Sequence, residues 1–204
     1  GLGRLIAKGD ILPVGSDAST DTGFYVIPEQ RLDGGKIRFV RSMQSDKFEG
    51  RTITRFTKTE FRRDPRGNRQ GIRMDFDGEG FQSGGQLNIV SEVTIAGDIQ
   101  ITGDGTPFVL MHECQTTGGY PRLGTILPCD LNKVSQAPIG SSLKFELLTF
   151  KEGAAIQARS SAVLSGLRKS SKPLIRDVTT IKDFLSYQLI SGAISTKNDD
   201  LDEG

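Results

Sequence analysis

Glycine-rich turns divide the chain into short apolar stretches, and this division constrains the fold more than any other feature of the sequence. Apolar and polar residues alternate over 36–41 and over 140–150, as in strands with one buried face. The apolar stretch 108–111 follows a turn signal at 103–107 and is expected to be a buried strand. Glycine makes up 25 of 204 residues, against about 7% in an average protein. Many short strands joined by tight turns predict a mainly β protein with a closed or nearly closed barrel.

The hydrophobic periodicity changes in the last quarter of the chain. Ile156, Val163 and Leu164 fall on one helical face within 154–169, and a second apolar stripe follows within 179–191. Both stripes are expected to lie on helices. Each stripe either packs on the parent barrel or docks on a partner subunit, and the sequence leaves both interpretations open.

These patterns predict three regions. Residues 1–35 are expected to hold the end of a preceding N-terminal portion and a linker, and residues 36–153 the β-barrel domain. Residues 154–204 are expected to form a helical C-terminal extension that ends in an acidic tail. Within the barrel region, the pattern at 45–57 fits a short helix and a strand equally well.

Charge and motif content exclude several classes of protein. The formal net charge of +1 argues against a dedicated nucleic-acid binder, which usually carries a strong basic excess. No apolar run reaches the length of a membrane span and no signal peptide is visible, so a cytoplasmic location is expected. The single histidine, His112, excludes a histidine-rich metal site. Cys114 and Cys129 do not form a close metal-type pair, so no bound metal is expected.

The stretch Gln-Thr-Thr-Gly-Gly-Tyr-Pro at 115–121 is the strongest chemical signal in the sequence. Gly118 and Gly119 lack a Cβ, so the backbone can approach a ligand closely and direct N–H groups at a carbonyl or an oxyanion. The neighbouring threonines, Glu113 and Tyr120 add hydrogen-bonding groups and an aromatic surface for stacking. The alternative is a tight turn that only closes the barrel. Residue types alone do not separate the two.

A basic segment precedes this stretch. Residues 51–73 include eight basic and two acidic residues, a net charge of +6. Within the segment, Asn68, Arg69 and Arg73 are candidates for binding a carboxylate, because guanidinium groups match carboxylates in a forked geometry. The alternatives are a solvated strand face with surface arginines and an anion- or nucleic-acid-binding surface.

Five motifs, in matching order, resemble the family that includes KipA, allophanate hydrolase subunit 2 and the C subunit of 5-oxoprolinase, to which the urea carboxylase carboxyltransferase domain also belongs. Together they extend over about residues 3–152, and Gln-Thr-Thr-Gly-Gly-Tyr-Pro is the most specific of them. The resemblance implies a cyclophilin-like β-barrel, in agreement with the strand pattern. It also identifies the chain as the C-terminal portion of a longer subunit. The motifs lie at 3–15, 68–75, 91–111, 115–121 and 130–148.

The resemblance also implies a binding cleft lined by the 115–121 stretch. It implies that the residues acting in catalysis are Glu113, Gln115, Thr116 and Tyr120. The residues that it implies for substrate binding are Asn68, Arg69, Arg73, Thr117, Gly118, Gly119 and Pro121.

Two branches of the family imply different chemistry in this cleft. In the urea carboxylase branch, carboxybiotin supplied by a partner delivers CO2 to a urea-like amide nitrogen. This chain itself has no biotin attachment site, since none of its methionines is followed by lysine. In the 5-oxoprolinase branch, the cleft holds a small cyclic amide while partner subunits supply ATP-coupled chemistry. The implied partner is a KipI-like or allophanate hydrolase subunit 1-like protein. The alternative to both is a non-catalytic regulator of the KipA type that binds a KipI-like partner.

The chain departs from the family pattern immediately before the 115–121 stretch. The family usually has Ala-Asp-Arg there, whereas this chain has His112, Glu113 and Cys114. A carboxylate is kept on a side chain one methylene longer, but the arginine is lost. This departure bears directly on the identity of the substrate, because an arginine at that position would pair with an anion.

Overall fold

The computed structural model of the chain describes residues 6–16, 25–26, 32–84 and 90–173. The chain divides into two compact units, Gly1–Ile27 with Ser171–Gly204, and Pro28–Ser170. In the first unit, β1 (Tyr25–Val26) pairs antiparallel with β11 (Lys172–Pro173). The second unit contains the barrel and the candidate site.

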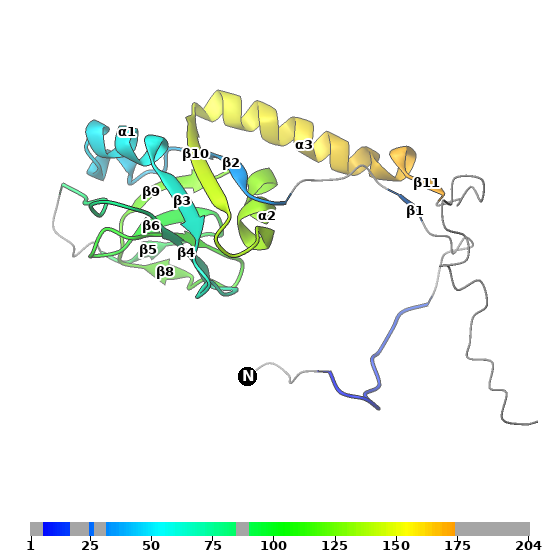
Figure 1. Ribbon diagram of the computed structural model, residues 1–204. Coiled ribbons are helices and arrows are strands. Elements are labelled where there is room, and N and C mark those ends of the chain that lie inside the picture. The colour runs from blue at the N-terminus through cyan, green and yellow to red at the C-terminus, as the bar shows by residue number, and fades with distance from the viewer. Residues whose placement is uncertain (1–5, 17–24, 27–31, 85–89, 174–204) are drawn as a thin grey trace, which may run out of the picture. The chain divides into compact units, whose positions relative to one another are not determined.

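Among the described residues, seven strands form a closed barrel in the larger unit (Figure 1). Their order around the barrel is β10 (Ser142–Leu148), β2 (Gly35–Val40), β9 (Arg122–Ile126), β6 (Asp98–Ile101), β7 (Pro107–Leu110), β4 (Gly71–Asp75) and β3 (Glu60–Arg63). Neighbouring strands are antiparallel except β10 and β2, which are parallel and join the last strand of the barrel to the first. The mainly β fold with a closed barrel is therefore confirmed.

Phenylalanine rings fill the interior of the barrel. Phe39 of β2 and Phe145 of β10 point inward with the regular alternation of a strand, and both are buried. Phe56 closes the cluster, with its ring centroid 5.8 Å from Phe39, 4.9 Å from Phe145 and 4.8 Å from Phe61. Edge-on and tilted aromatic pairs at these distances contribute beyond their buried area. These phenylalanine side chains therefore fill the core, and the alternate positions of the strands face outward.

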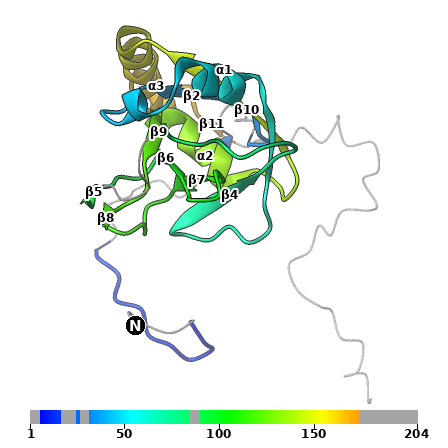
Figure 2. The same cartoon turned by 90° about the vertical axis from the view of Figure 1, so that its left-hand side faces the viewer.

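The helices sit outside this core. They are η1 (Ser45–Lys47), α1 (Gly50–Lys58), α2 (Pro128–Gln136) and α3 (Phe150–Ser170). Ile53 and Phe56, one turn apart on α1, are its buried residues, so the segment left open between helix and strand is a helix that caps the barrel. Gly153 lets α3 begin against the barrel, since a Cβ there would lie 2.8 Å from Cγ1 of Val40. In the two views, α1 lies on one side of the barrel and the strand β8 on the other (Figures 1 and 2).

Several expectations for individual segments can be compared with these elements. The strands expected at 36–41 and 140–150 are β2 and β10, and the helix expected at 154–169 lies within α3. The second helical stripe, at 179–191, lies outside the described residues. The boundaries proposed for the three regions stay predictions. Within the described part of the chain, no helix is both long and apolar enough to cross a membrane.

The buried strand expected at 108–111 is found as β7, but it is buried on one face only. Val109 and Met111 are buried, whereas Phe108 and Leu110 are only half-buried. An apolar side chain at every position hides the strand alternation, so the sequence contains no sign that two of these residues face outward. Those two residues belong to the candidate site.

Candidate functional site

The outer face of three neighbouring barrel strands carries the side chains of the candidate site. The ladder places Phe108 of β7 opposite Arg73 of β4 on one side and opposite Gln100 of β6 on the other. Ile72 and Val109, the neighbours of Arg73 and Phe108 along these strands, are buried inside the barrel. Because successive side chains of a strand point to opposite faces, Arg73, Phe108 and Gln100 form one row on the outside.

A cavity of about 360 Å³ lies on this face. Phe108 and Leu110 give it an apolar floor, and Gln100 contributes an amide. Residues of the segment 114–120 form one wall, and residues of the loop 66–71 form another. The volume falls at the small end of the range of ligand pockets, and an apolar floor with a few polar groups is the usual composition of such sites. The cavity therefore fits a small, partly apolar molecule.

The wall that contains β8 (Thr117–Gly118) is attached to the barrel through β5 (Glu92–Val93). The backbone N–H of Thr94 donates to the carbonyl of Thr116 (3.0 Å), and the Thr94 hydroxyl donates to the carbonyl of Gln115. Hydrogen-bonded pairs recur at every second position of an antiparallel ladder, so the N–H of Gly118 is directed at β5 and not into the cavity. Of the two adjacent glycines, only Gly119 lies beyond this ladder.

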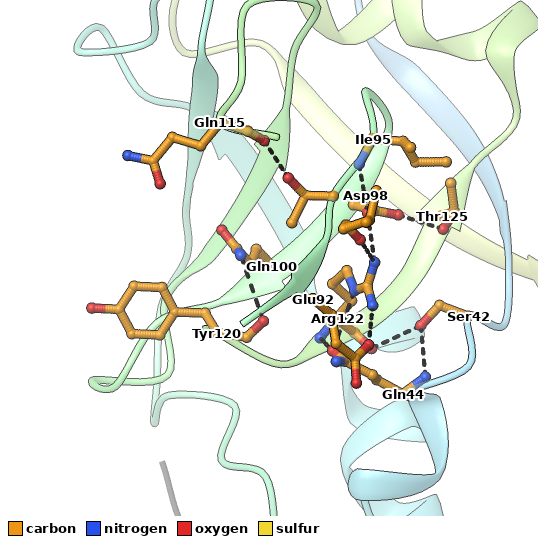
Figure 3. A network of polar contacts seen from close by, with 12 residues as sticks. Ser42, Gln44, Glu92, Ile95, Asp98, Gln100, Gln115, Tyr120, Arg122 and Thr125 are labelled. Carbon is orange, nitrogen blue, oxygen red and sulfur yellow. Dashed lines mark hydrogen bonds and ion pairs between the residues drawn. The ribbon is translucent and has the colours of Figure 1, made fainter. Parts of the chain in front are cut away.

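Arg122 of β9 fixes β5 against the barrel (Figure 3). Its guanidinium donates to the carboxylate of Glu92 (2.6 Å from Nη2), to the carbonyl of Val93, and to the carboxylate of Asp98 (3.4 Å from Nη1). Its Nε and its backbone N both donate to Oε1 of Gln44, at 3.2 and 2.9 Å. The side chain of Arg122 is only 12% exposed. Charge-assisted hydrogen bonds in such a sheltered position hold the geometry of the wall firmly.

Gly118 allows the amide of Gln100 to lie directly against β8. A Cβ at position 118 would come within 2.7 Å of Nε2 of Gln100, which is closer than real Cβ contacts. The same nitrogen donates to the carbonyl of Tyr120 over 3.5 Å, which is long for a hydrogen bond and leaves the donor available to a ligand. The side chains of Gln115 and Tyr120 extend to the same side, with Gln100 between them (Figure 3).

The opposite wall is a loop organised by Asn68. Its Oδ1 accepts hydrogen bonds from the backbone N–H groups of Gln70 (2.8 Å) and Gly71 (3.2 Å), so the side chain stabilises its own turn. Next to it, Nε of Arg69 lies 3.2 Å from Oε2 of Glu113. Both of these side chains are more than half exposed, and a pair of this kind adds little stability.

The structure brings together about half of the residues selected from the sequence. Those lining the cavity are Asn68, Gln115, Thr117, Gly118, Gly119 and Tyr120. Those outside its lining are Arg69, Arg73, Glu113, Thr116 and Pro121. The Thr116 carbonyl takes part in the attachment of β8 to β5, and the Pro121 carbonyl accepts from the N–H of Ile101 (2.9 Å). The roles assigned to all eleven residues stay predictions.

Sequence reasoning did not select several residues of the cavity, notably Arg66, Gln100, Phe108 and Leu110. For Gln100 a signal was present, since it is the polar residue between Ile99 and Ile101 in an alternating strand. For Phe108 and Leu110 the sequence contains no such signal, because every residue of the stretch 108–111 is apolar. Among the described residues, no group of three or more histidine, cysteine, aspartate or glutamate side chains is arranged to hold a metal ion.

Comparison with known proteins relates this barrel to a family and to two curated relatives. Residues 1–147 match the model of a family described as "Carboxyltransferase domain, subdomain A and B". The chain is 27% identical over 169 residues to the C subunit of 5-oxoprolinase from Haemophilus influenzae, covering 82% of this chain and 53% of that protein. It is 29% identical over 157 residues to the corresponding 5-oxoprolinase subunit of Escherichia coli, covering 77% and 49%. The chain thus spans about half the length of these curated relatives.

A solved structure agrees with the fold. The urea carboxylase of Kluyveromyces lactis superposes with a TM-score of 0.58 at 19% identity, covering 71% of this chain and 14% of that protein. At this identity the similarity concerns the fold alone. It supports the barrel architecture independently of the sequence match.

Proposed function

Because the chain belongs to the family of the carboxyltransferase domain, subdomain A and B, we propose that it supplies the amide-binding cavity of a 5-oxoprolinase-type enzyme. Both curated relatives are named as one subunit of 5-oxoprolinase, which supports an enzyme assembled from several subunits. The partner in this proposal is a KipI-like or allophanate hydrolase subunit 1-like protein. The substrate is a small cyclic amide, with 5-oxoproline as the first candidate.

One arrangement carries this proposal, namely the Gln100 amide at the edge of an apolar floor in a cavity of about 360 Å³. A five-membered lactam ring has two flat apolar faces and a polar edge with one carbonyl and one N–H. Its face packs on Phe108 and Leu110, and its carbonyl oxygen accepts a hydrogen bond from Nε2 of Gln100. The hydroxyl of Thr117 and the amide of Gln115 supply acceptors for the ring N–H.

The cavity offers binding and orientation more than proton transfer. Among its described lining residues there is neither a carboxylate nor an imidazole. Glu113, selected from the sequence for that role, is paired with Arg69 outside the cavity lining. Opening an amide needs a general base or an activated water and protonation of the leaving nitrogen. In this proposal the partner subunit supplies those groups, and this chain fixes the amide.

The ureido ring of carboxybiotin presents the same chemistry as a lactam, with a ring carbonyl flanked by N–H. The residues present fit that ring as well, with Gln100 at the ureido oxygen and Phe108 beneath the ring. When bound, carboxybiotin would supply the carboxyl group for transfer to an amide nitrogen. Measuring the affinity of the chain for biotin and for 5-oxoproline separates these two occupants of one cavity.

The proposal is tested by purifying the chain with its partner subunit and measuring ATP-dependent hydrolysis of 5-oxoproline to glutamate. In the Gly118→Ala variant a methyl group meets the flexible end of Gln100, so the amide moves while the fold persists. We expect turnover to fall at least about 10-fold, because small displacements of positioning groups have effects of this size. Gly166→Ala, in an open position on α3, is the matched control and should leave turnover unchanged.

Two results would contradict this function. If Gly118→Ala turned over 5-oxoproline as fast as the unmodified chain, the cavity would not hold the substrate. If the partner bound but neither 5-oxoproline nor a urea-like amide were consumed, the chain would act as a non-catalytic regulator of the KipA type. In that case variants of Glu113 and Gln115 would keep the regulatory effect.

A further inference from the structure

Two arginines share one buried carboxylate beside the cavity. The side chain of Asp64 is only 5% exposed. The guanidinium of Arg66 donates two hydrogen bonds to it, from Nε to Oδ1 (2.9 Å) and from Nη2 to Oδ2 (2.6 Å). Nη1 of Arg73 lies 3.5 Å from the same Oδ2. Hydrogen bonding from Arg66 holds the pKa of Asp64 below its ordinary value, so the carboxylate is ionised at neutral pH. Arg66 and Arg73 thus bring two positive charges to the one carboxylate of Asp64. The carboxylate of Asp75 also attracts Arg66 and lies 3.7 Å from Nη2 of Arg62.

Of these charged residues, Arg66 is the one that lines the cavity. Its side chain contributes to the cavity lining, whereas Arg69, three residues later, is paired with Glu113 and does not. The backbone N–H of Arg66 also donates to Oδ1 of Asp64 (2.8 Å), so both ends of the residue are anchored on one carboxylate. The hydrogen bonds to Asp64 use Nε and Nη2 of the guanidinium. The guanidinium is thus oriented in advance, yet its side chain is 69% exposed and open to a ligand.

The remainder of the cavity lining is neutral. Phe108, Leu110, Gln100 and Thr117 bear no charge, and no acidic side chain is found among the described lining residues. A ligand carboxylate near Arg66 would therefore meet a cation without facing an opposing anion inside the cavity. A guanidinium that already has one fixed partner can bind a second carboxylate through its remaining N–H groups.

We propose that Arg66, held by Asp64, forms an anion subsite that selects ring amides bearing a carboxylate over neutral amides. The inference rests on the proposed function, because it assumes that a cyclic amide occupies the cavity. With the ring on Phe108 and its carbonyl at Gln100, a carboxylate on the ring carbon across the nitrogen from the carbonyl is directed to the 66–71 wall. The subsite places 5-oxoproline ahead of urea, which has no carboxylate, as the preferred substrate class.

Calorimetric titration of the full chain with 5-oxoproline and with 2-pyrrolidinone, the same ring without the carboxylate, tests the subsite. The unmodified chain should bind 5-oxoproline about 10- to 100-fold more tightly than 2-pyrrolidinone, the range expected of charge-assisted hydrogen bonds. Arg66→Gln should bring the two affinities within about threefold by weakening only 5-oxoproline. Arg62→Gln removes one charge from β3 outside the cavity lining, where Arg62 pairs with Asp77, and should keep the preference.

The outcomes separate this inference from the proposed function. If both rings bound the unmodified chain equally well, the anion subsite would be overturned while the amide cavity would stand. If Arg62→Gln removed the preference as completely as Arg66→Gln, a diffuse charge effect would replace the subsite. If neither ring bound, the proposed function would fall together with the subsite. Thermal unfolding of both variants shows that any loss of affinity arises in a folded chain.

Discussion

Replacing Arg122 by alanine should both destabilise the barrel and loosen the cavity wall. Arg122 connects β9 to β5 through Glu92 and Val93, and β5 in turn carries the segment 115–118. The substitution removes the guanidinium without touching any residue of the cavity lining. Its effect on binding therefore reports how far the wall depends on this anchor.

The size of the effect follows from what each partner loses. Asp98, whose side chain is 2% exposed, keeps hydrogen bonds from the backbone N–H of Ile95 (3.0 Å) and the hydroxyl of Thr125 (2.7 Å). The side chain of Glu92 is 47% exposed and returns to water. The loss should therefore fall at the lower end of the range for breaking a buried ion pair, about 3 kcal/mol. For a unit of this size, that corresponds to a decrease of about 10 °C in Tm.

Thermal unfolding at neutral pH measures this loss, with Arg62→Ala as the control. Arg62 also pairs with a carboxylate, that of Asp77, but the two side chains are 41% and 88% exposed. Its removal should change stability by less than about 1 kcal/mol. Arg122→Ala should in addition weaken binding of 5-oxoproline, whereas Arg62→Ala should not. Equal losses of Tm in the two variants would refute the reasoning from burial.

Three further predictions concern stability. Asp130 is fully buried and accepts two hydrogen bonds of 2.7 Å from Arg38; burial alone would raise its pKa, but the hydrogen bonds outweigh burial and hold the pKa below its ordinary value. The stabilisation that ionised Asp130 gives the folded state is therefore present above the unfolded-state pKa of about 4 and is lost as the pH falls through the lower folded-state pKa. Asp130→Asn should reduce the free energy of unfolding by about 3 kcal/mol at pH 7 and by progressively less below pH 4, as measured in urea titrations. Gly124→Ala should reduce the free energy of unfolding by about 1–3 kcal/mol in the same titrations, because the alanine Cβ would lie 2.5 Å from Cδ2 of Phe39. An unchanged urea midpoint would contradict this close packing. Gly166→Ala should increase the free energy of unfolding by about 1 kcal/mol, because the position is open and alanine favours the helix. A decrease would contradict the open position of Gly166.

The sequence predicted those parts of the fold that depend on local patterns. Gly118 and Gly119 were expected to bring the backbone close to a ligand, and this role stays a prediction; in the structure Gly118 lies against the amide of Gln100, and its N–H is directed at β5. The short alternating strands predicted the barrel, because a period of two requires one buried face. The strand pattern is local because it follows from the backbone conformation of consecutive residues, whereas the contact of Gly118 with Gln100 joins two strands.

The remaining parts of the site depend on contacts between distant segments. The parallel pairing of β10 with β2 joins residues that are more than 100 positions apart, and no local pattern specifies it. Arg122 was not selected from the sequence, because its partners Glu92 and Gln44 approach it only through the barrel fold. Glu113 was selected as a carboxylate near the glycines, but in the structure it pairs with Arg69, on the loop before β4, and is not among the residues that line the cavity. Such partner choices are decided by tertiary structure.

A structure of the chain with bound 5-oxoproline tests the central claim most directly. The ring should lie on Phe108 and Leu110, with the lactam oxygen within hydrogen-bonding distance of Nε2 of Gln100. A larger open groove of about 690 Å³, lined in part by Lys36 and Lys144, offers the ligand an alternative place. Density for 5-oxoproline in that groove, with the cavity beside Gln100 empty, would contradict the account.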